Sequence, residues 1–193
     1  PVQSAGSSPG QQTQTIQQAI KRALAHHAAG RLTEAEGIYR EILQIDPHEP
    51  TALHLRGIIA HRVGNIEVAV DLITKALAIK PDYAEAHSNL GVALQDQGKL
   101  DEAVASFHKA LAINPDYAEA HHNLGVALQE QGRIDEAIGY LKRADPETVK
   151  SKSSAHLLKC YYIKQDKGEF DRQLDLISKN QKFNFQAASI SAF

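Results

Sequence analysis

PDYAEAHSNLGVAL, residues 81–94, returns as PDYAEAHHNLGVAL at residues 115–128, thirty-four positions later. From Pro81 to Ala103, 19 of 23 residues are identical to those from Pro115 to Ala137, so the second stretch is a copy of the first. Self-similarity at this period is typical of a helical hairpin repeated along a solenoid, in which each copy buries its apolar face against the next. The repeat therefore predicts an all-α fold that serves binding rather than catalysis.

Small residues recur at the same period and indicate where two helices approach closely. One series is Ala35, Ala69, Ala103 and Ala137, and the other is Ala23, Gly57, Gly91 and Gly125. Glycine inside a helix costs about 1 kcal/mol relative to alanine, so we expect it where a side chain would block helix contact. We therefore predict that Gly91 faces Ala103, and that Gly125 faces Ala137, within their hairpins.

Glycine and proline mark the turns of the expected hairpins. Gly30, Gly64, Gly98 and Gly132 separate first from second helices, and Pro47, Pro81 and Pro115 follow the second helices. Proline ends a helix because it has no N–H to donate to the preceding turn. The first helices are expected near 17–29, 51–63, 84–97, 118–131 and 153–166.

The array resembles the tetratricopeptide repeat family. The third copy carries the residue types of that motif at Leu90, Gly91, Leu94, Ala103, Phe107, Ala110 and Pro115. The resemblance implies a right-handed superhelical solenoid of antiparallel helix pairs. It places four regular repeats at residues 16–49, 50–83, 84–117 and 118–151. Beyond them the period is broken, and alignment on Gly168 puts Gln173 where the regular repeats have alanine. We expect residues 152–182 to form a degenerate helical hairpin that caps the array.

The two ends of the chain differ from the repeats in composition. Residues 1–15 are almost entirely Gln, Ser, Thr, Gly and Pro, which predicts a disordered tail too polar to pack. Residues 183–193 are apolar instead, with three phenylalanines and one isoleucine. Such a segment is expected to pack on the last hairpin, to join two copies of the chain into a homo-oligomer, or to contact a further domain.

Charge and cysteine content limit the classes of partner. A net charge of −2 does not provide the basic face that nucleic acid requires. No apolar run approaches the roughly 20 residues that span a bilayer, and no signal peptide is evident. The single cysteine, Cys160, forms no internal disulfide, which predicts a cytoplasmic protein. Residues 81–144 carry ten acidic and five basic residues, so the best-formed repeats are the acidic part of the chain.

In this family the concave groove is lined by positions 2, 5, 6, 9, 12 and 13 of each first helix, which share one helix face. The residues expected to contact a bound peptide are Asn89, Asn123, Glu85, Glu119, Ser88, His122, Val92, Val126, Gln95, Gln129, His54 and His61. Asn89 and Asn123 occupy the same slot, and an amide can both donate to and accept from a peptide backbone. The pair is similar to the asparagine ladder in the repeat arm of the protein O-linked N-acetylglucosamine transferase. The alternative is a local hydrogen bond between repeats.

Other chemistries fit these residues less well. Glu85 and Glu119 would repel a carboxylate, which disfavours the acidic-tail clamp of some relatives. Equivalent positions on packed helices lie about 8–10 Å apart, too far for histidines such as His54 and His61 to converge on zinc. We expect no metal and no cofactor. No nucleophile–base pair or phosphate-binding loop stands out, so we do not expect an enzyme.

These patterns favour a scaffold that binds an extended, neutral to basic protein segment in its groove. Two alternatives stay open. Residues 155–161 and 173–175 are similar to the stretch that follows repeat arrays in large bacterial proteins, so the chain could be the non-catalytic, substrate-recruiting arm of a transferase or oxygenase extending beyond Phe193. It could also be a structural protein that self-associates through residues 183–193. The sequence does not specify the partner.

Overall fold

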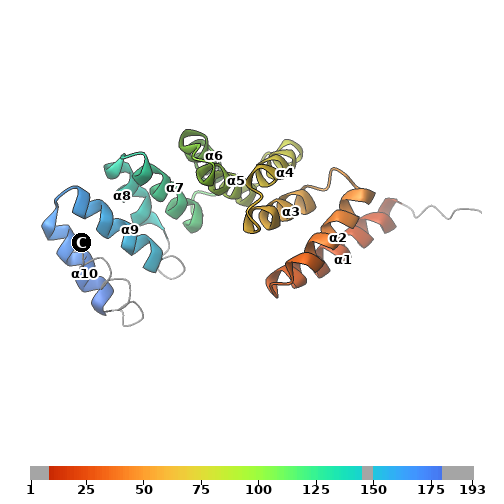
Figure 1. Ribbon diagram of the computed structural model, residues 1–193, viewed down its shortest axis with the longest axis horizontal. Coiled ribbons are helices and arrows are strands. Elements are labelled where there is room, and N and C mark those ends of the chain that lie inside the picture. The colour runs from red at the N-terminus through yellow and green to blue at the C-terminus, as the bar shows by residue number, and fades with distance from the viewer. Residues whose placement is uncertain (1–8, 145–149, 180–193) are drawn as a thin grey trace, which may run out of the picture. The chain divides into compact units, whose positions relative to one another are not determined.

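The computed structural model describes residues 9–144 and 150–179, and these residues form ten α-helices and no β-strand (Figure 1). The helices are α1 (Pro9–Ala28), α2 (Leu32–Ile45), α3 (Pro50–Arg62), α4 (Ile66–Ile79), α5 (Ala84–Asp96), α6 (Leu100–Ile113), α7 (Ala118–Glu130), α8 (Ile134–Arg143), α9 (Lys150–Ile163) and α10 (Lys167–Lys179). Each odd-numbered helix packs on the helix that follows it, which makes five hairpins. The all-α class of repeated helix pairs is confirmed.

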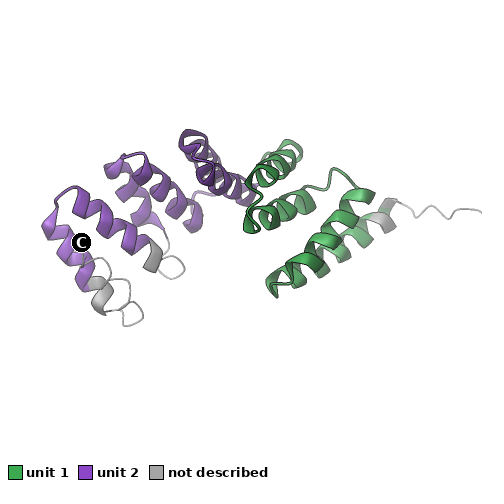
Figure 2. Ribbon diagram, in the orientation of Figure 1, with its two compact units in different colours: residues 1–82 green, residues 83–193 purple. Residues whose placement is uncertain are grey.

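The helices belong to two compact units, residues 1–82 and 83–193 (Figure 2). The first unit contains the hairpins α1–α2 and α3–α4, and α2 also packs on α3. Its core includes Tyr39 and Ala35, which are fully buried, and Ile42, which is 2% exposed. These residues lie three and four apart on one face of α2, the spacing that places a stripe of side chains against neighbouring helices.

The second unit contains the hairpins α5–α6, α7–α8 and α9–α10. Within it α5 packs on α7 and α7 packs on α9, while α6 packs on α7 and α8 packs on α9. The three first helices α5, α7 and α9 therefore lie side by side as one row. Residues that point outward from this row belong to one continuous surface, and most of the candidate site lies there.

The expected turns between first and second helices are confirmed in the four regular hairpins. Gly30, Gly64, Gly98 and Gly132 have φ values between 73° and 85°, a region open to glycine because it has no Cβ. Two backbone bonds close each helix end: Gly132 N–H donates to the Gln129 carbonyl and Arg133 N–H to the Leu128 carbonyl, for example. Second helices α2, α4 and α6 end two residues before the next proline.

The helical glycines allow close contact within the hairpins, but the main neighbour differs from the expected alanine. A Cβ added to Gly91 would lie 2.5 Å from Cε1 of Phe107, and its three nearest atoms all belong to that ring. At Gly125 the nearest atom is Cγ of Leu141 at 2.6 Å, followed by the Ala137 carbonyl oxygen at 3.2 Å. The prediction that Gly91 faces Ala103 was therefore incomplete, because a large side chain one turn farther along the second helix fills the space.

The first helix begins earlier than its composition indicates. Helix α1 starts at Pro9, so residues 9–15 are helical and do not belong to a disordered tail. Proline suits the first position of a helix because its φ is already helical, and glutamine is a good helix former. Polarity alone was therefore a poor guide to where the helix starts. The remaining tail residues 1–8 and the apolar residues 183–193 lie outside the described residues.

The fifth hairpin turns at Gln165, not at Gly168. Gln165 has a φ of 56°, and the N–H groups of Gln165 and Asp166 donate to the carbonyls of Tyr162 and Tyr161. These bonds match those at Gly132, so α9 follows α7 with an offset of 33 residues. Phe170 thus takes the place of the small residue at Ala137, where the alignment on Gly168 had put Gln173. The capping hairpin is degenerate at that contact because a phenylalanine replaces an alanine.

This turn leads to a prediction about stability. Replacing Gln165 by glycine should stabilise the protein by about 1 kcal/mol, because a side chain strains the left-handed conformation that glycine adopts readily. Chemical denaturation would measure the change. The matched control is Gln97→Gly, at a helix end where φ is −80°. The control should destabilise, since glycine only adds freedom to the unfolded chain there. Equal effects at both sites would contradict the argument.

Candidate functional site

Ten of the twelve expected site residues lie on α5 and α7 in the second unit, and two lie on α3 in the first. Their environments divide them into groups that the sequence did not distinguish. Ser88, His122 and Gln129 are buried, at 2%, 7% and 7% exposed. Glu85 and Glu119 are exposed, and the remaining members on α5 and α7 are half-buried. Position on the correct helix face was therefore not sufficient for access to a ligand.

The residues at position 5 bond to the next repeat. The Ser88 hydroxyl hydrogen bonds with the phenol of Tyr117, which immediately precedes α7. One repeat later, Nδ1 of His122 lies 2.9 Å from Oγ of Ser153 on α9. Ser153 is only 4% exposed, so this second bond is buried on both sides. Each bond ties one first helix to the start of the next.

The residues at position 12 also reach the next first helix. Nε2 of Gln95 on α5 donates to Oε1 of Glu130 on α7 at 2.9 Å. Nδ1 of His156 on α9 donates to Oε1 of Gln129 on α7 at 2.7 Å. We call Ser88, Gln95, His122 and Gln129 the inter-repeat seam. Their amide, hydroxyl and imidazole groups hold α5, α7 and α9 together, a role that the sequence assigned to peptide contact.

What is left forms a regular surface on α5 and α7, which we call the inner face: Glu85, Asn89, Val92, Glu119, Asn123 and Val126. The two asparagines and two valines are half-buried, and the two glutamates are exposed. Each helix therefore presents a carboxylate, an amide and an apolar side chain in the same order. Because α5 and α7 pack side by side, the second set lies one repeat from the first.

His156 continues the asparagine slot into α9, which the sequence analysis missed. With the 33-residue offset it is the equivalent of Asn123, and its imidazole is half-buried. Burial first, and then the nearby Lys159 ammonium, lower the pKa of His156, while Glu130 opposes them. The ring is thus neutral near pH 7 and donates only through Nδ1. Alignment of Leu157 with Leu124 would have revealed this equivalence.

Tyr117 adds a second residue that the sequence analysis did not single out. Burial, together with the charges of Glu119 and Glu85, raises the pKa of Tyr117 to about 12. The phenol therefore keeps its proton and contributes a neutral hydrogen-bonding group between two acids. The same shift shows that both carboxylates act on the junction between α5 and α7, so this end of the inner face has a negative potential.

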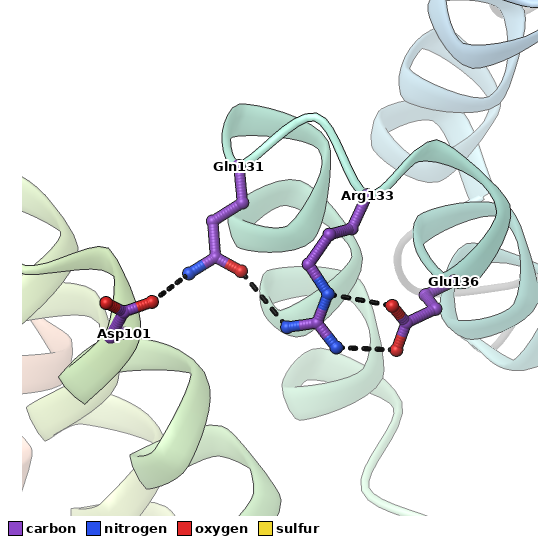
Figure 3. A network of polar contacts seen from close by, with 4 residues as sticks. All are labelled: Asp101, Gln131, Arg133 and Glu136. Atoms are coloured by element: carbon purple, nitrogen blue, oxygen red, sulfur yellow. Dashed lines mark hydrogen bonds and ion pairs between the residues drawn. The ribbon is translucent and has the colours of Figure 1, made fainter.

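A polar network on the opposite side of the hairpin turn links the third and fourth repeats (Figure 3). Gln131 donates from Nε2 to Oδ1 of Asp101 on α6 at 2.8 Å and accepts from Arg133 at 3.2 Å. Arg133 in turn forms two bonds to Glu136, at 2.7 Å and 2.6 Å. Lys164 and Asp135 repeat the link between the fourth and fifth hairpins at 2.5 Å. These turns are therefore occupied by structural contacts.

The structure brings together one pair that resembles catalytic machinery, His122 and Ser153. Both side chains are buried, so a substrate cannot reach the hydroxyl without separating α7 from α9. Burial also raises the pKa of the Cys160 thiol to about 11, which keeps it protonated and unreactive. Among residues 9–144 and 150–179, no three His, Cys, Asp or Glu side chains are arranged to hold a metal ion. None of the helices described is both long and apolar enough to cross a membrane.

The two expected site residues on α3 differ from each other. His54 is 3% exposed, and burial lowers its pKa to about 4. It is a neutral histidine of the first unit's interior. His61, two turns later, is half-buried. His54 is therefore better explained as a packing residue than as a ligand contact.

Family models match several parts of the chain. One described as TPR repeat matches residues 64–98 and 93–132, and two described as Tetratricopeptide repeat match residues 19–50 and 120–152. The matches together extend over residues 19–50 and 64–152. A comparison with curated proteins found no match to this sequence.

Solved structures of repeat proteins are similar to the whole chain. Pseudomonas aeruginosa pilF has a TM-score of 0.79 and 18% identity, over 91% of this chain and 81% of that chain. YrrB, described as a TPR protein with an unusual peptide-binding site, has a TM-score of 0.74 and 20% identity, over 94% and 98%. A Thermobaculum terrenum O-GlcNAc transferase has a TM-score of 0.64 and 30% identity, over 72% of this chain but only 27% of that chain. The repeated motif, the helix pairs and the matching family models agree, and the chain belongs to the tetratricopeptide repeat family.

Proposed function

We propose that the protein is an interaction module that binds an extended, neutral to basic segment of another protein on the inner face of α5 and α7. The observation that carries this proposal is the repetition of one set of side chains, Glu85, Asn89 and Val92, on the neighbouring helix. Seam contacts use other positions, so this set is not required to hold the two helices together.

The spacing of the two sets suits a peptide backbone. Packed helices lie about 8–10 Å apart, and an extended chain advances about 3.3 Å per residue, so equivalent slots meet every third residue. An amide in each slot pairs with backbone N–H and C=O groups whatever the ligand side chains are. Val92 and Val126 supply apolar contact, and the likeness to YrrB supports peptide binding on this fold.

The charge of the inner face favours a ligand without acidic residues. Glu85 and Glu119 are exposed, and Glu130 adds a third exposed carboxylate at the other end of α7. No item of opposite charge among Lys or Arg belongs to the inner face. Rim charges of this kind affect association rate and salt dependence more than they affect buried contact energy.

This proposal predicts a clear ranking among peptides. Ten-residue extended peptides with basic or no charge should bind the full chain, and acidic peptides of the same apolar content should not. Binding of the basic peptides should weaken between 50 and 500 mM salt, because partly exposed charges are screened, conditions of about 14 Å and 4 Å Debye length. Isothermal titration would measure both effects. Stronger binding of the acidic peptides would overturn the proposal.

Two matched pairs of variants locate the binding. Asn123→Ala should weaken peptide binding about five-fold, the loss of one hydrogen bond of about 1 kcal/mol. Asn65→Ala, at a helix start where the side chain makes no capping bond, should leave it unchanged. Glu119→Gln should reduce the salt dependence, whereas Glu102→Gln on α6 should not. Unchanged affinity in Asn123→Ala would remove the amide from the site.

A second candidate function is the substrate-recruiting arm of a larger enzyme. The likeness to the O-GlcNAc transferase favours it, because this chain matches only 27% of that protein. The inner face would then present a protein segment to a catalytic domain elsewhere in the same polypeptide. Sequencing the gene beyond the codon for Phe193 tests this directly. A stop codon at that point would exclude an arm with a catalytic domain after the array.

A further inference from the structure

Helix α9 exposes an apolar residue at a seam position. The shared turn geometry makes Tyr162 the equivalent of Gln129, whose side chain bonds to the next first helix. Tyr162 is 64% exposed, and Ile163 beside it is 49% exposed. In the two preceding repeats the seam position carries a glutamine that bonds to a neighbour. In α9 it carries a large apolar side chain that no described residue covers.

A hollow adjoins this side chain. It has a volume of about 470 Å³ and is lined by Tyr161, Tyr162, Ile163, Gln165, Asp166, Lys167 and Phe170. The rings of Tyr162 and Phe170 stand 6.4 Å apart, one on each helix of the hairpin. The aromatic side chains make this a surface for an apolar occupant, and it lies where the regular array would place a further repeat.

The length of the following chain leads to the same surface. Four residues, 114–117, separate the end of α6 from the start of α7, and four residues, 46–49, separate α2 from α3. Helix α10 ends at Lys179, so an equal link brings the chain back to α9 at residue 184. The next residues are apolar at Phe185 and Ile190 and carry no acid.

The sequence of that segment also retains part of the repeat. Residues 186–193 read QAASISAF, and residues 85–92 read EAHSNLGV. Alanine and serine coincide at the second and fourth places, and a small residue stands at the seventh, where the helices of a hairpin approach closely. Phe185 replaces the alanine that begins α5, so the segment is more apolar than a regular copy.

We propose that residues 184–193 bind their own α9–α10 hairpin at Tyr162, Ile163 and Phe170, on the surface that a next first helix would cover. Phe185 and Ile190 supply the apolar contact. This closes the end of the array and withdraws its aromatic residues from solvent. The proposal does not depend on peptide binding at the inner face, which lies on α5 and α7.

The only cysteine of the chain provides a sensitive reporter. Cys160 lies on α9, two residues before Tyr162, and is fully buried. A thiol reagent such as a maleimide reaches it only when the hairpin opens locally, so its labelling rate measures the stability of this hairpin. In the full chain, Phe185→Ser/Ile190→Ser should speed labelling about ten-fold, the equivalent of 1.4 kcal/mol. Val68→Ser, at a 48% exposed valine on α4, is the matched control and should not.

Coupling between the two surfaces decides the assignment. Tyr162→Ser alone should also speed labelling, and adding it to Phe185→Ser/Ile190→Ser should have little further effect, because both remove one contact. Light scattering should give the same monomeric mass for all variants. An unchanged rate in Phe185→Ser/Ile190→Ser, or fully additive rates, would overturn the proposal. A dimer that dissociates in the same variant would assign the segment to a second copy instead and also overturn it.

Discussion

Lowering the pH from 7 to 4 should remove about 3 kcal/mol of folding free energy from the first unit through His54 alone. The residue is almost fully buried, and burial lowers its pKa from 6.5 to about 4. In the unfolded chain the same imidazole takes up a proton below pH 6.5. Folding therefore excludes that proton, and the stability present above pH 6.5 is lost progressively as the pH falls towards 4.

Urea titrations of the full chain at several pH values, followed by helical circular dichroism, would measure this loss. His54→Leu should flatten the pH dependence between 6.5 and 4, because the buried titrating group is gone. His48→Leu is the control, since His48 is exposed and should leave the slope unchanged. Burial also lowers the pKa of His27, so some dependence should persist in His54→Leu. Identical slopes in His54→Leu and the parent protein would show that another group is responsible.

Gly91→Leu should destabilise the second unit by about 1–3 kcal/mol, the range typical of overpacked interiors. Even the first added carbon would lie 2.5 Å from the Phe107 ring, so helices α5 and α6 must separate or the ring must leave its position. Phe107 is fully buried, which leaves it little room to move. The cost should therefore appear as a lower melting temperature and a lower urea midpoint.

Gly139→Leu is the matched control for this substitution. Gly139 also lies within a helix, but nothing lies within 4 Å of a Cβ added there. Leucine should stabilise that position by up to about 1 kcal/mol, because glycine is the poorer helix former. In addition, Phe107→Leu should partly rescue Gly91→Leu by making space. A melt unchanged by Gly91→Leu would show that the contact between α5 and α6 is wrongly assigned.

Much of the fold followed from local chemistry. Glycine at Gly98 and Gly132 predicted the turns because few other residues adopt a positive φ without strain. The turn at Gln165 could not be found in this way, because a residue with a Cβ takes that conformation only when its neighbours require it. The start of α1 at Pro9 was missed for a different reason. Polar residues form a helix readily when their backbone bonds are satisfied, and composition does not report that.

The site was predictable only to the level of a helix face. Spacing correctly placed Ser88 and His122 on the same face as Asn123, but it did not show which of them meet a neighbouring helix. That depends on the offset between repeats, which is 33 residues at α9 and brings Ser153 against His122. A sequence with one fixed period carries no record of such a shift, so the buried seam residues were indistinguishable from exposed ones.

The division of labour between the inter-repeat seam and the inner face has an evolutionary consequence. Substitutions at Asn123 or Val126 leave the bonds of His122 and Gln129 in place, so they can change what is bound without loosening the array. Each repeat is then a separately recodable reader on a common frame. New specificities can arise, or be designed, by rewriting slots one repeat at a time, while the order of the helices and their stability are inherited unchanged.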